Sequence, residues 1–327
     1  MNEEKKARKL EAKRIKDINN SLSYLSNSSR KELGILAIQK EENVFFCGNN
    51  IYKKVYTFKP ALLNNKKLEL LKALCGMFQN RIRLSLCLKN KDGKLNAYMF
   101  MTVTFIATSF YEVQKEISSF ESEINRNICS ILHIQIVPCN LENTLTFIHM
   151  NCTGEMKKFD TNRLFQKKLT GSLFAEATAT EPGAFKCGNR YGVLYIGKDF
   201  PQKTEDVMSI FATYEGTYQM CIDFQSYTEE DKEIFQYELK NKFSQEAKNK
   251  ESVIVNATYL LTLISESKDS LCELDEKITE FYDMKNILLM PGVDRERDIQ
   301  MSICTLGLSD FHSMQNVNLN VLSELLM

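Results

Sequence analysis

The sequence lacks an excess of charge of either sign, a long apolar run and an N-terminal signal sequence. Lys plus Arg and Asp plus Glu both number 42 among 327 residues, whereas nucleic-acid binders usually carry a clear basic excess. The longest nearly uncharged run, residues 98–111, is shorter than the roughly 20 residues of a membrane-spanning helix. The composition therefore favours a cytoplasmic globular chain with one large or two ordinary domains.

Recognisable catalytic and metal-binding motifs are also missing from the sequence. The 10 cysteines stand singly, without a C-x-x-C pair, and the 3 histidines, His133, His149 and His312, are scattered. Serine-nucleophile and H-E-x-x-H motifs do not occur. We expect no catalytic residue, no metal and no cofactor, and we interpret the cysteines and histidines as structural residues.

What the sequence does contain is a recurring pattern that we interpret as an internal duplication; the alternative is that similar α+β segments coincide by chance. The tripeptide Cys-Gly-Asn at 47–49 recurs at 187–189, and an apolar, strand-forming run follows it in both places. Both copies then continue with a helix, an alternating strand, an apolar strand, a second helix and a strand that ends at proline. These segments are 70–78, 82–88, 99–106, 109–120 and 131–138 in the first copy, and 207–214, 218–224, 253–264, 270–281 and 287–291 in the second.

This order of elements is typical of split β-α-β, or ferredoxin-like, units. We therefore predict an α+β fold with two such units, each an antiparallel-rich sheet with helices on one face. The period-two segments predict one buried face per sheet, and Ser109 and Ser270 are the predicted N-caps of the second helix in each copy. The predicted divisions are a polar, basic leader at 1–40, a first unit at 41–150, a connector at 151–184, and a second unit at 185–327 with an inserted helix near 228–250.

One segment matches the G-x-x-x-x-G-K pattern of phosphate-binding loops, at Gly192, Gly197 and Lys198. The residues between the glycines form an apolar, strand-forming run rather than a flexible turn, and Asp199 stands where Ser or Thr would bind magnesium. We interpret the three matching residues as structural. The alternative, an NTPase that uses Lys198, predicts nucleotide binding that a Lys198→Ala variant loses.

The leader contains the candidate residues for contact with a partner or a membrane surface: Lys5, Lys6, Arg8, Lys9, Lys13 and Arg14. Acidic residues interleaved with them in the sequence dilute their field, which favours a solvated tail. A further alternative is a nucleic-acid adaptor, because ferredoxin-like sheets bind RNA through exposed aromatic residues. Tyr218 and Phe224 alternate with polar residues and fit a core better, so we predict no direct nucleic-acid contact.

The run 185–196, followed by Phe200-Pro201, resembles a segment of the CagE/TrbE/VirB family of conjugation ATPases, which includes TraE/TrsE-like proteins. In that family a strand pair precedes a proline-led helix. The stretches 307–314 and 321–327 resemble the end of the family's N-terminal domain, so the resemblance spans roughly residues 40–327. It implies a non-catalytic scaffold that docks onto inner-membrane subunits of a type IV secretion machine, at the cytoplasmic face of a bacterial membrane, and that is oligomeric in the assembled machine.

Members of the family hydrolyse ATP in a RecA-like C-terminal domain. Apart from the partial match at 192–198, which lacks the Ser or Thr after the lysine, no segment of this chain matches the Walker A and B motifs of that domain. The resemblance therefore implies an ATPase domain that acts in cis or in trans. The apolar ending at 325–327 leads us to expect a truncated product, a split gene or an excised domain.

Overall fold

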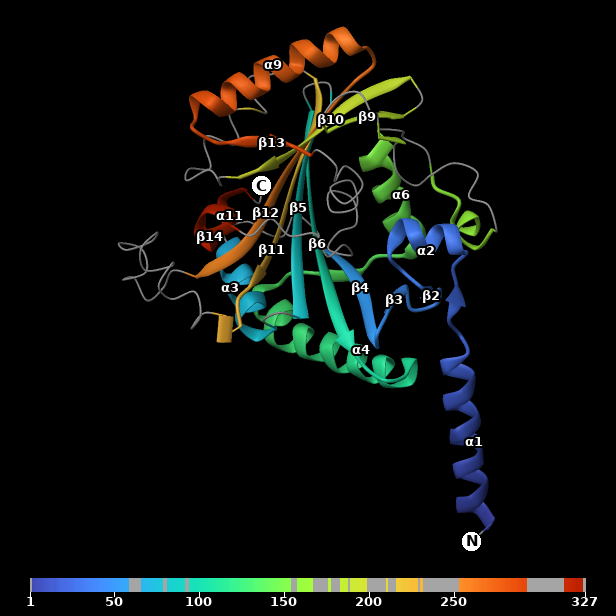
Figure 1. The fold of residues 1–327 in the computed structure, drawn as a ribbon. Helices are drawn as coiled ribbons and strands as arrows, with labels where there is room; N and C mark the ends of the chain where they lie inside the picture. Colours follow the sequence, from blue (N-terminus) through green and yellow to red (C-terminus); the bar gives the residue numbers. More distant parts are fainter. Residues whose placement is uncertain are drawn as a thin grey trace.

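One antiparallel sheet of 14 strands runs through both halves of the chain in the computed structural model (Figure 1). The residues that the structure describes are 2–58, 66–78, 81–91, 94–153, 158–166, 176–177, 183–187, 189–198, 210, 216–228, 230–231, 253–292 and 315–325. Helices pack on the sheet, so the fold class is α+β, as predicted.

The first half of the chain supplies seven of the strands. They are β1 (Ser23–Tyr24), β2 (Ala37–Gln39), β3 (Val44–Gly48), β4 (Ile51–Phe58), β5 (Ile82–Lys91), β6 (Lys94–Ile106) and β7 (Ile136–Pro138). The described helices of this half are α1 (Asn2–Asn19), α2 (Asn27–Leu33), α3 (Lys67–Met77), α4 (Phe110–Ile124), the π-helix η3 (Asn125–Cys129), α5 (Ser130–Leu132) and α6 (Leu141–Thr153).

The second half supplies the other strands. They are β8 (Glu176–Ala177), β9 (Ala184–Cys187), β10 (Arg190–Gly197), β11 (Thr217–Ser226), β12 (Ile254–Ser265), β13 (Leu289–Pro291) and β14 (Gln315–Asn318). Its described helices are the 3-10 helix η4 (Thr161–Phe165), α9 (Lys268–Met284) and α11 (Leu319–Leu325).

The two halves meet edge to edge where β5 pairs with β11. Leu86 lies opposite Ile222 at the middle of this seam, and Cys87 lies opposite Cys221. The strand order is β1-β2-β3-β4-β6-β5-β11-β12-β10-β9-β8, with β7 beside β4, β13 beside β10 and β14 beside β12. The sequence predicted separate sheets, and this prediction is wrong. The two sheets merge because each has an outer strand whose free backbone groups pair with those of the other.

Four strands of each half lie in the same spatial order, β7-β4-β6-β5 in the first and β13-β10-β12-β11 in the second. In both halves the short strand that ends at proline pairs with a tyrosine: Tyr56 lies opposite Pro138, and Tyr195 lies opposite Pro291. The helices α4 and α9 bury apolar residues at the same spacing, at 110, 113, 117 and 120 and at 271, 274, 278 and 281.

The N-terminus of α4 is as predicted, but α9 begins one turn earlier. Ser109 Oγ accepts the N–H of Glu112 at 3.4 Å. In α9 the N-cap is Ser267, whose Oγ accepts the N–H of Ser270 at 3.1 Å. The extended backbone of Ser267 suits a cap, and Asp269 in the first turn is stabilised by the helix dipole, so the helix extends beyond the predicted start.

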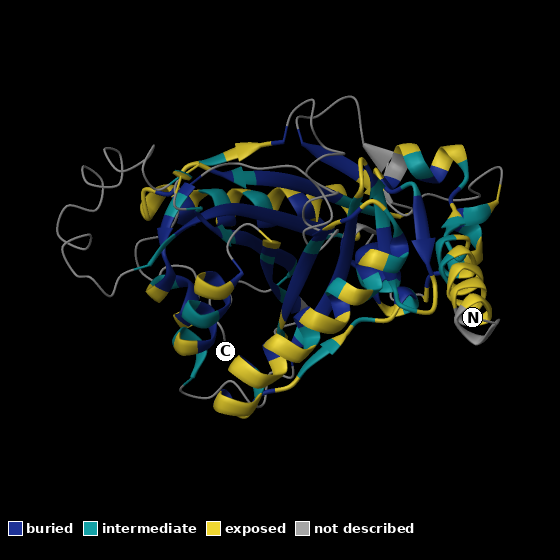
Figure 2. Ribbon diagram, turned by 90° about the horizontal axis from the view of Figure 1, so that it is seen from below, coloured by how far each residue is buried: buried dark blue, intermediate teal, exposed yellow. Residues whose placement is uncertain are grey.

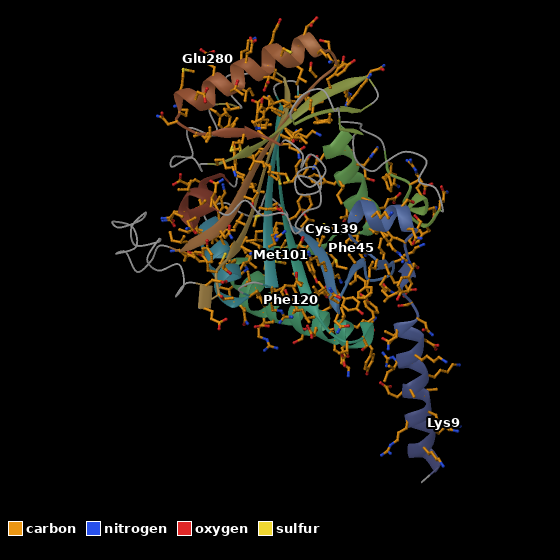
Figure 3. The ribbon with its side chains drawn as sticks, in the orientation of Figure 1. Lys9, Phe45, Met101, Phe120, Cys139 and Glu280 are labelled. Atoms are coloured by element: carbon orange, nitrogen blue, oxygen red, sulfur yellow. The ribbon has the colours of Figure 1, made fainter. Side chains whose placement is uncertain are left out.

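Helices cover both faces of the sheet rather than one. On the first face, α3, α4, α9 and α11 pack over a core that includes Met101 and Phe120 (Figure 3). On the other face, α2 and α6 pack over a second core that includes Phe45 and Phe100. Ser85 and Cys87, on this second face, are therefore buried as well. The alternation of apolar and polar residues identified the apolar face of β5. It did not reveal that a second layer of helices covers the polar face of this strand.

Residues 23–39 belong to the sheet and the core rather than to a solvated leader. β2 pairs with both β1 and β3, and Leu25, Leu33 and Ile38 are buried. Among the described residues of the predicted leader, those of α1 stand apart from the body, and Figure 2 shows most of this helix coloured as exposed.

The turn between β3 and β4 has the conformation that Cys-Gly-Asn predicted. Gly48, Asn49 and Asn50 have φ values of 93°, 49° and 63°, a region that glycine and asparagine tolerate. A capping box also forms at Thr228, whose Oγ1 accepts the N–H of Asp231 at 2.9 Å. Most of the predicted segments 207–214 and 228–250, and much of the connector 151–184, lie outside the described residues.

Candidate docking site

The segment that matches a phosphate-binding loop is a strand with neighbours on both sides. From Tyr191 to Gly197 it pairs with β12, and on its other side it pairs with β9 and then with β13. The N–H of Lys198 donates to the carbonyl of Leu288 at 2.8 Å. Because the N–H groups of a strand point alternately to its two sides, they do not converge on one anion as they do in a phosphate loop.

Both glycines of this segment lie beneath aromatic rings. A Cβ on Gly192 would lie 2.1 Å from Phe185 Cζ, and a Cβ on Gly197 would lie 2.1 Å from Tyr259 Cδ1. Each ring belongs to the residue directly opposite on the neighbouring strand. Close packing of a ring on the backbone therefore accounts for glycine at both positions. The side chain of Lys198 is exposed.

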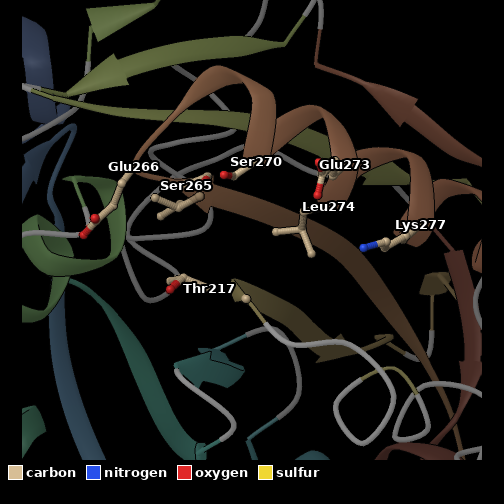
Figure 4. Close-up of a pocket in the computed structure, with 9 residues that line it drawn as sticks. Thr217, Ser265, Glu266, Ser270, Glu273, Leu274 and Lys277 are labelled. Atoms are coloured by element: carbon tan, nitrogen blue, oxygen red, sulfur yellow. The ribbon is translucent and has the colours of Figure 1, made fainter.

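A cavity of about 410 Å³ lies between α9 and the ends of β11 and β12 (Figure 4). Its charged lining residues are Glu266, Glu273 and Lys277. Figure 4 shows Glu266 and Lys277 at opposite ends of the cavity, so these groups do not converge on one point. The described part of the chain also contains no group of three or more His, Cys, Asp or Glu side chains arranged to hold a metal ion.

Sequence reasoning missed one buried acidic residue at the seam. Asp223 lies opposite Ser85, whose hydroxyl donates to its carboxylate. Burial raises the pKa of Asp223, while Arg83, Ser85 and Lys53 act in the opposite direction. The carboxylate of Asp223 therefore interacts with polar and charged residues of the first half across the seam. In the sequence Asp223 occupies the polar side of an alternating strand, and only the second layer of the fold buries it.

The predicted contact residues lie on α1, which is fixed to the body near its C-terminal end. Asn19 Oδ1 accepts the N–H of Tyr111 at 3.1 Å, at the start of α4, and the Tyr111 hydroxyl donates to Glu11 Oε1 at 2.9 Å. Ile18 packs against the core. One side of α1 thus faces the body, and its N-terminal part extends away from it (Figure 1).

The charges of α1 separate when they are placed on a helix. With about 100° per residue, six basic residues fall within an arc of about 160° that contains no acid: Lys5, Lys6, Arg8, Lys9, Lys13 and Lys16. We call this arc the basic face. Glu11 lies on the other side, which faces α4, and Arg14 lies outside the arc. All six residues of the basic face are exposed.

The interleaved acids therefore dilute the field of α1 less than expected, although the exposed Asp17 lies just outside the arc. Helix geometry groups the lysines, and the contact with Tyr111 turns Glu11 toward the body. The result is a uniformly basic surface on a helix that stands away from the sheet, which attracts an anionic partner.

Comparison with protein-family models and with curated proteins finds no match to this chain. Among the described residues, no helix is both long enough and apolar enough to span a membrane.

Proposed function

We propose that the chain is a non-catalytic docking and scaffold domain of a conjugative-transfer, or type IV secretion, ATPase. In this proposal it consists of two ferredoxin-like units that arose by internal duplication and merged at the β5–β11 seam. The equal strand order of the two halves and the matching helix faces of α4 and α9 support the duplication. The ATPase domain acts in cis or in trans.

The observation that carries this proposal is the basic face of α1. The sheet buries its apolar residues beneath helices on both faces, so the body uses them for its own stability. The basic face instead presents six exposed cations on a helix fixed at one end. Such a surface provides contact and orientation rather than chemistry. We place it at the cytoplasmic face of a bacterial membrane, where it docks the chain into the transfer machine beside inner-membrane subunits.

The test is recruitment that depends on α1. The tagged chain is expressed with and without the genes that flank its own, and the amount in the inner-membrane fraction is measured. We expect recruitment only with the flanking genes, and its loss when Lys5, Lys9 and Lys16 are changed to Glu. The matched control changes Lys31, Lys94 and Lys186, which are also exposed, to Glu. Equal recruitment of all variants would refute the proposal.

A phosphate-release assay on the purified chain separates this proposal from the NTPase alternative. We expect no ATP turnover above background, and no effect of ATP on the unfolding temperature. Turnover that disappears in Lys198→Ala would instead support an enzyme that uses this residue.

A further inference from the structure

The helix α9 carries an acidic face that matches the basic face of α1 in length. Its exposed acids fall within an arc of about 80°, opposite the residues that α9 buries: Asp269, Glu273, Glu276, Glu280 and Asp283. We call this arc the acidic face. At 1.5 Å per residue it is about 21 Å long, and the basic face from Lys5 to Lys16 is about 16 Å long. No lysine of α9 lies within the acidic arc.

The two faces lie at opposite ends of the molecule. Figure 3 labels Lys9 on α1 and Glu280 on α9, with the sheet between them. Because α1 is anchored at Asn19 and extends away from α9, the basic face of one copy is directed away from the acidic face of the same copy (Figure 1). The matching faces are therefore placed for contact between copies.

An exposed apolar group flanks each charged face. Leu10, which is 73% exposed, borders the basic face of α1. Met284 borders the acidic face of α9, and Leu288 and Met290 follow it in the chain; their exposed fractions are 65%, 51% and 42%. Exposed ion pairs contribute little binding free energy by themselves. Burying an apolar side chain beside a row of such pairs increases the affinity of the contact.

We propose that the basic face of α1 docks along the acidic face of α9 in a second copy of this chain. The proposal rests on the proposed function only in taking α1 as the docking element. Because the two surfaces differ, the contact is head to tail, and it generates a ring or an open filament rather than a closed dimer. A second copy is favoured over other anionic partners because the chain itself presents a face of opposite charge and comparable length. This face, like the basic face, has exposed apolar residues beside it.

Charge reversal tests the contact in the full-length protein. One variant changes Lys5, Lys9 and Lys16 to Glu, and the other changes Glu273, Glu276 and Glu280 to Lys. All six positions are exposed, so circular dichroism and the unfolding midpoint are expected to stay unchanged. Sedimentation velocity is measured over a range of protein concentrations at about 0.1 M and about 1 M salt, where the Debye length falls from about 10 Å to about 3 Å.

We expect the unaltered chain to self-associate at low salt and to dissociate at high salt. Each reversal alone is expected to weaken association about tenfold or more. An equimolar mixture of the two variants is expected to associate again, since each now carries the face that the other lacks. The control variant at Lys31, Lys94 and Lys186, which has the same change in charge as the first, is expected to associate like the unaltered chain.

Three outcomes would overturn this contact. They are a monomer at all concentrations, association that neither reversal weakens, and a mixture that fails to reassociate. Vesicles of phosphatidylglycerol and a short DNA duplex serve as separate probes, and binding of either by a chain that stays monomeric assigns the basic face to that ligand instead. If α1-dependent recruitment to the membrane fraction persists without self-association, the proposed function stands and this contact is refuted.

Discussion

Replacing Gly197 by alanine is expected to destabilise the fold, because the new methyl group would enter the space of a buried ring. The added Cβ would lie 2.1 Å from Cδ1 and 3.0 Å from Cγ of Tyr259. Tyr259 is fully buried in the middle of the sheet, and its hydroxyl is hydrogen-bonded to that of Tyr282. Neither the ring nor the strand that carries it can move without disturbing this pair.

The size of the effect follows from two opposing contributions. Overpacking a core costs about 1–3 kcal/mol, and the lower entropy of the unfolded alanine chain offsets about 0.4–1 kcal/mol of it. We expect the free energy of unfolding to fall by about 1–2 kcal/mol in Gly197→Ala, which lowers Tm by roughly 1.5 °C per kcal/mol in a chain of this length.

Urea denaturation followed by circular dichroism measures this change, and Gly76→Ala is the matched control. Gly76 lies in the last turn of α3, and a Cβ there meets nothing within 4 Å. The same substitution is expected to stabilise the chain there by about 0.5–1 kcal/mol. If Gly197→Ala were neutral or stabilising, the steric explanation of this glycine would be refuted.

The other predictions concern contacts that fix α1, α4 and the seam. Asn19→Ala removes the acceptor for the Tyr111 N–H, so we expect a loss of about 1 kcal/mol and faster proteolysis of α1. Tyr56→Phe removes the hydroxyl that donates to Glu121, and we expect urea denaturation to show a loss of about 0.5–1.5 kcal/mol. Burial raises the folded-state pKa of Asp223, so its stabilising contribution is present below about pH 3.9 and is lost as the pH rises through the folded pKa. We expect the free energy of unfolding to fall less steeply with rising pH in Asp223→Asn than in the unaltered chain.

Each of these predictions has a result that contradicts it. Unchanged protease sensitivity in Asn19→Ala, with Asn20→Ala as control, would mean that this hydrogen bond does not anchor α1. A Tyr56→Phe variant as stable as the unaltered chain would show that its hydroxyl contributes nothing. Parallel stability–pH curves for Asp223→Asn and the unaltered chain would exclude a raised pKa at the seam.

The seam gives the molecule its shape and separates the two surfaces that we assign to docking. Without the pairing of β5 with β11, each half would expose a strand edge, which is a site for aggregation. With it, the sheet is continuous, with α9 packed on its second half and α1 anchored beside its first half (Figure 1). The distance between these helices is therefore a consequence of how the two halves join.

Residue spacing and turn chemistry were enough to predict many of the local elements. Three-and-four spacing located α3 and the buried faces of α4 and α9, and alternation located the apolar faces of β5 and β11. The prolines at 138 and 291 marked the ends of β7 and β13. These features depend on residues close together in the chain, whose periodicity and turn chemistry can be read directly.

How these elements combine depends on contacts that form only in the folded chain. The merging of the sheets, the second helical layer and the burial of Asp223 depend on contacts between residues far apart in the chain, for which the sequence carries no local signal. The basic face is an intermediate case. Five of its six residues, all but Lys16, were predicted as contact residues, but their separation from the acids required both helix geometry and the contact between Glu11 and Tyr111. Local periodicity determines which side of an element is apolar, and the packing of distant elements determines what covers that side and what remains exposed.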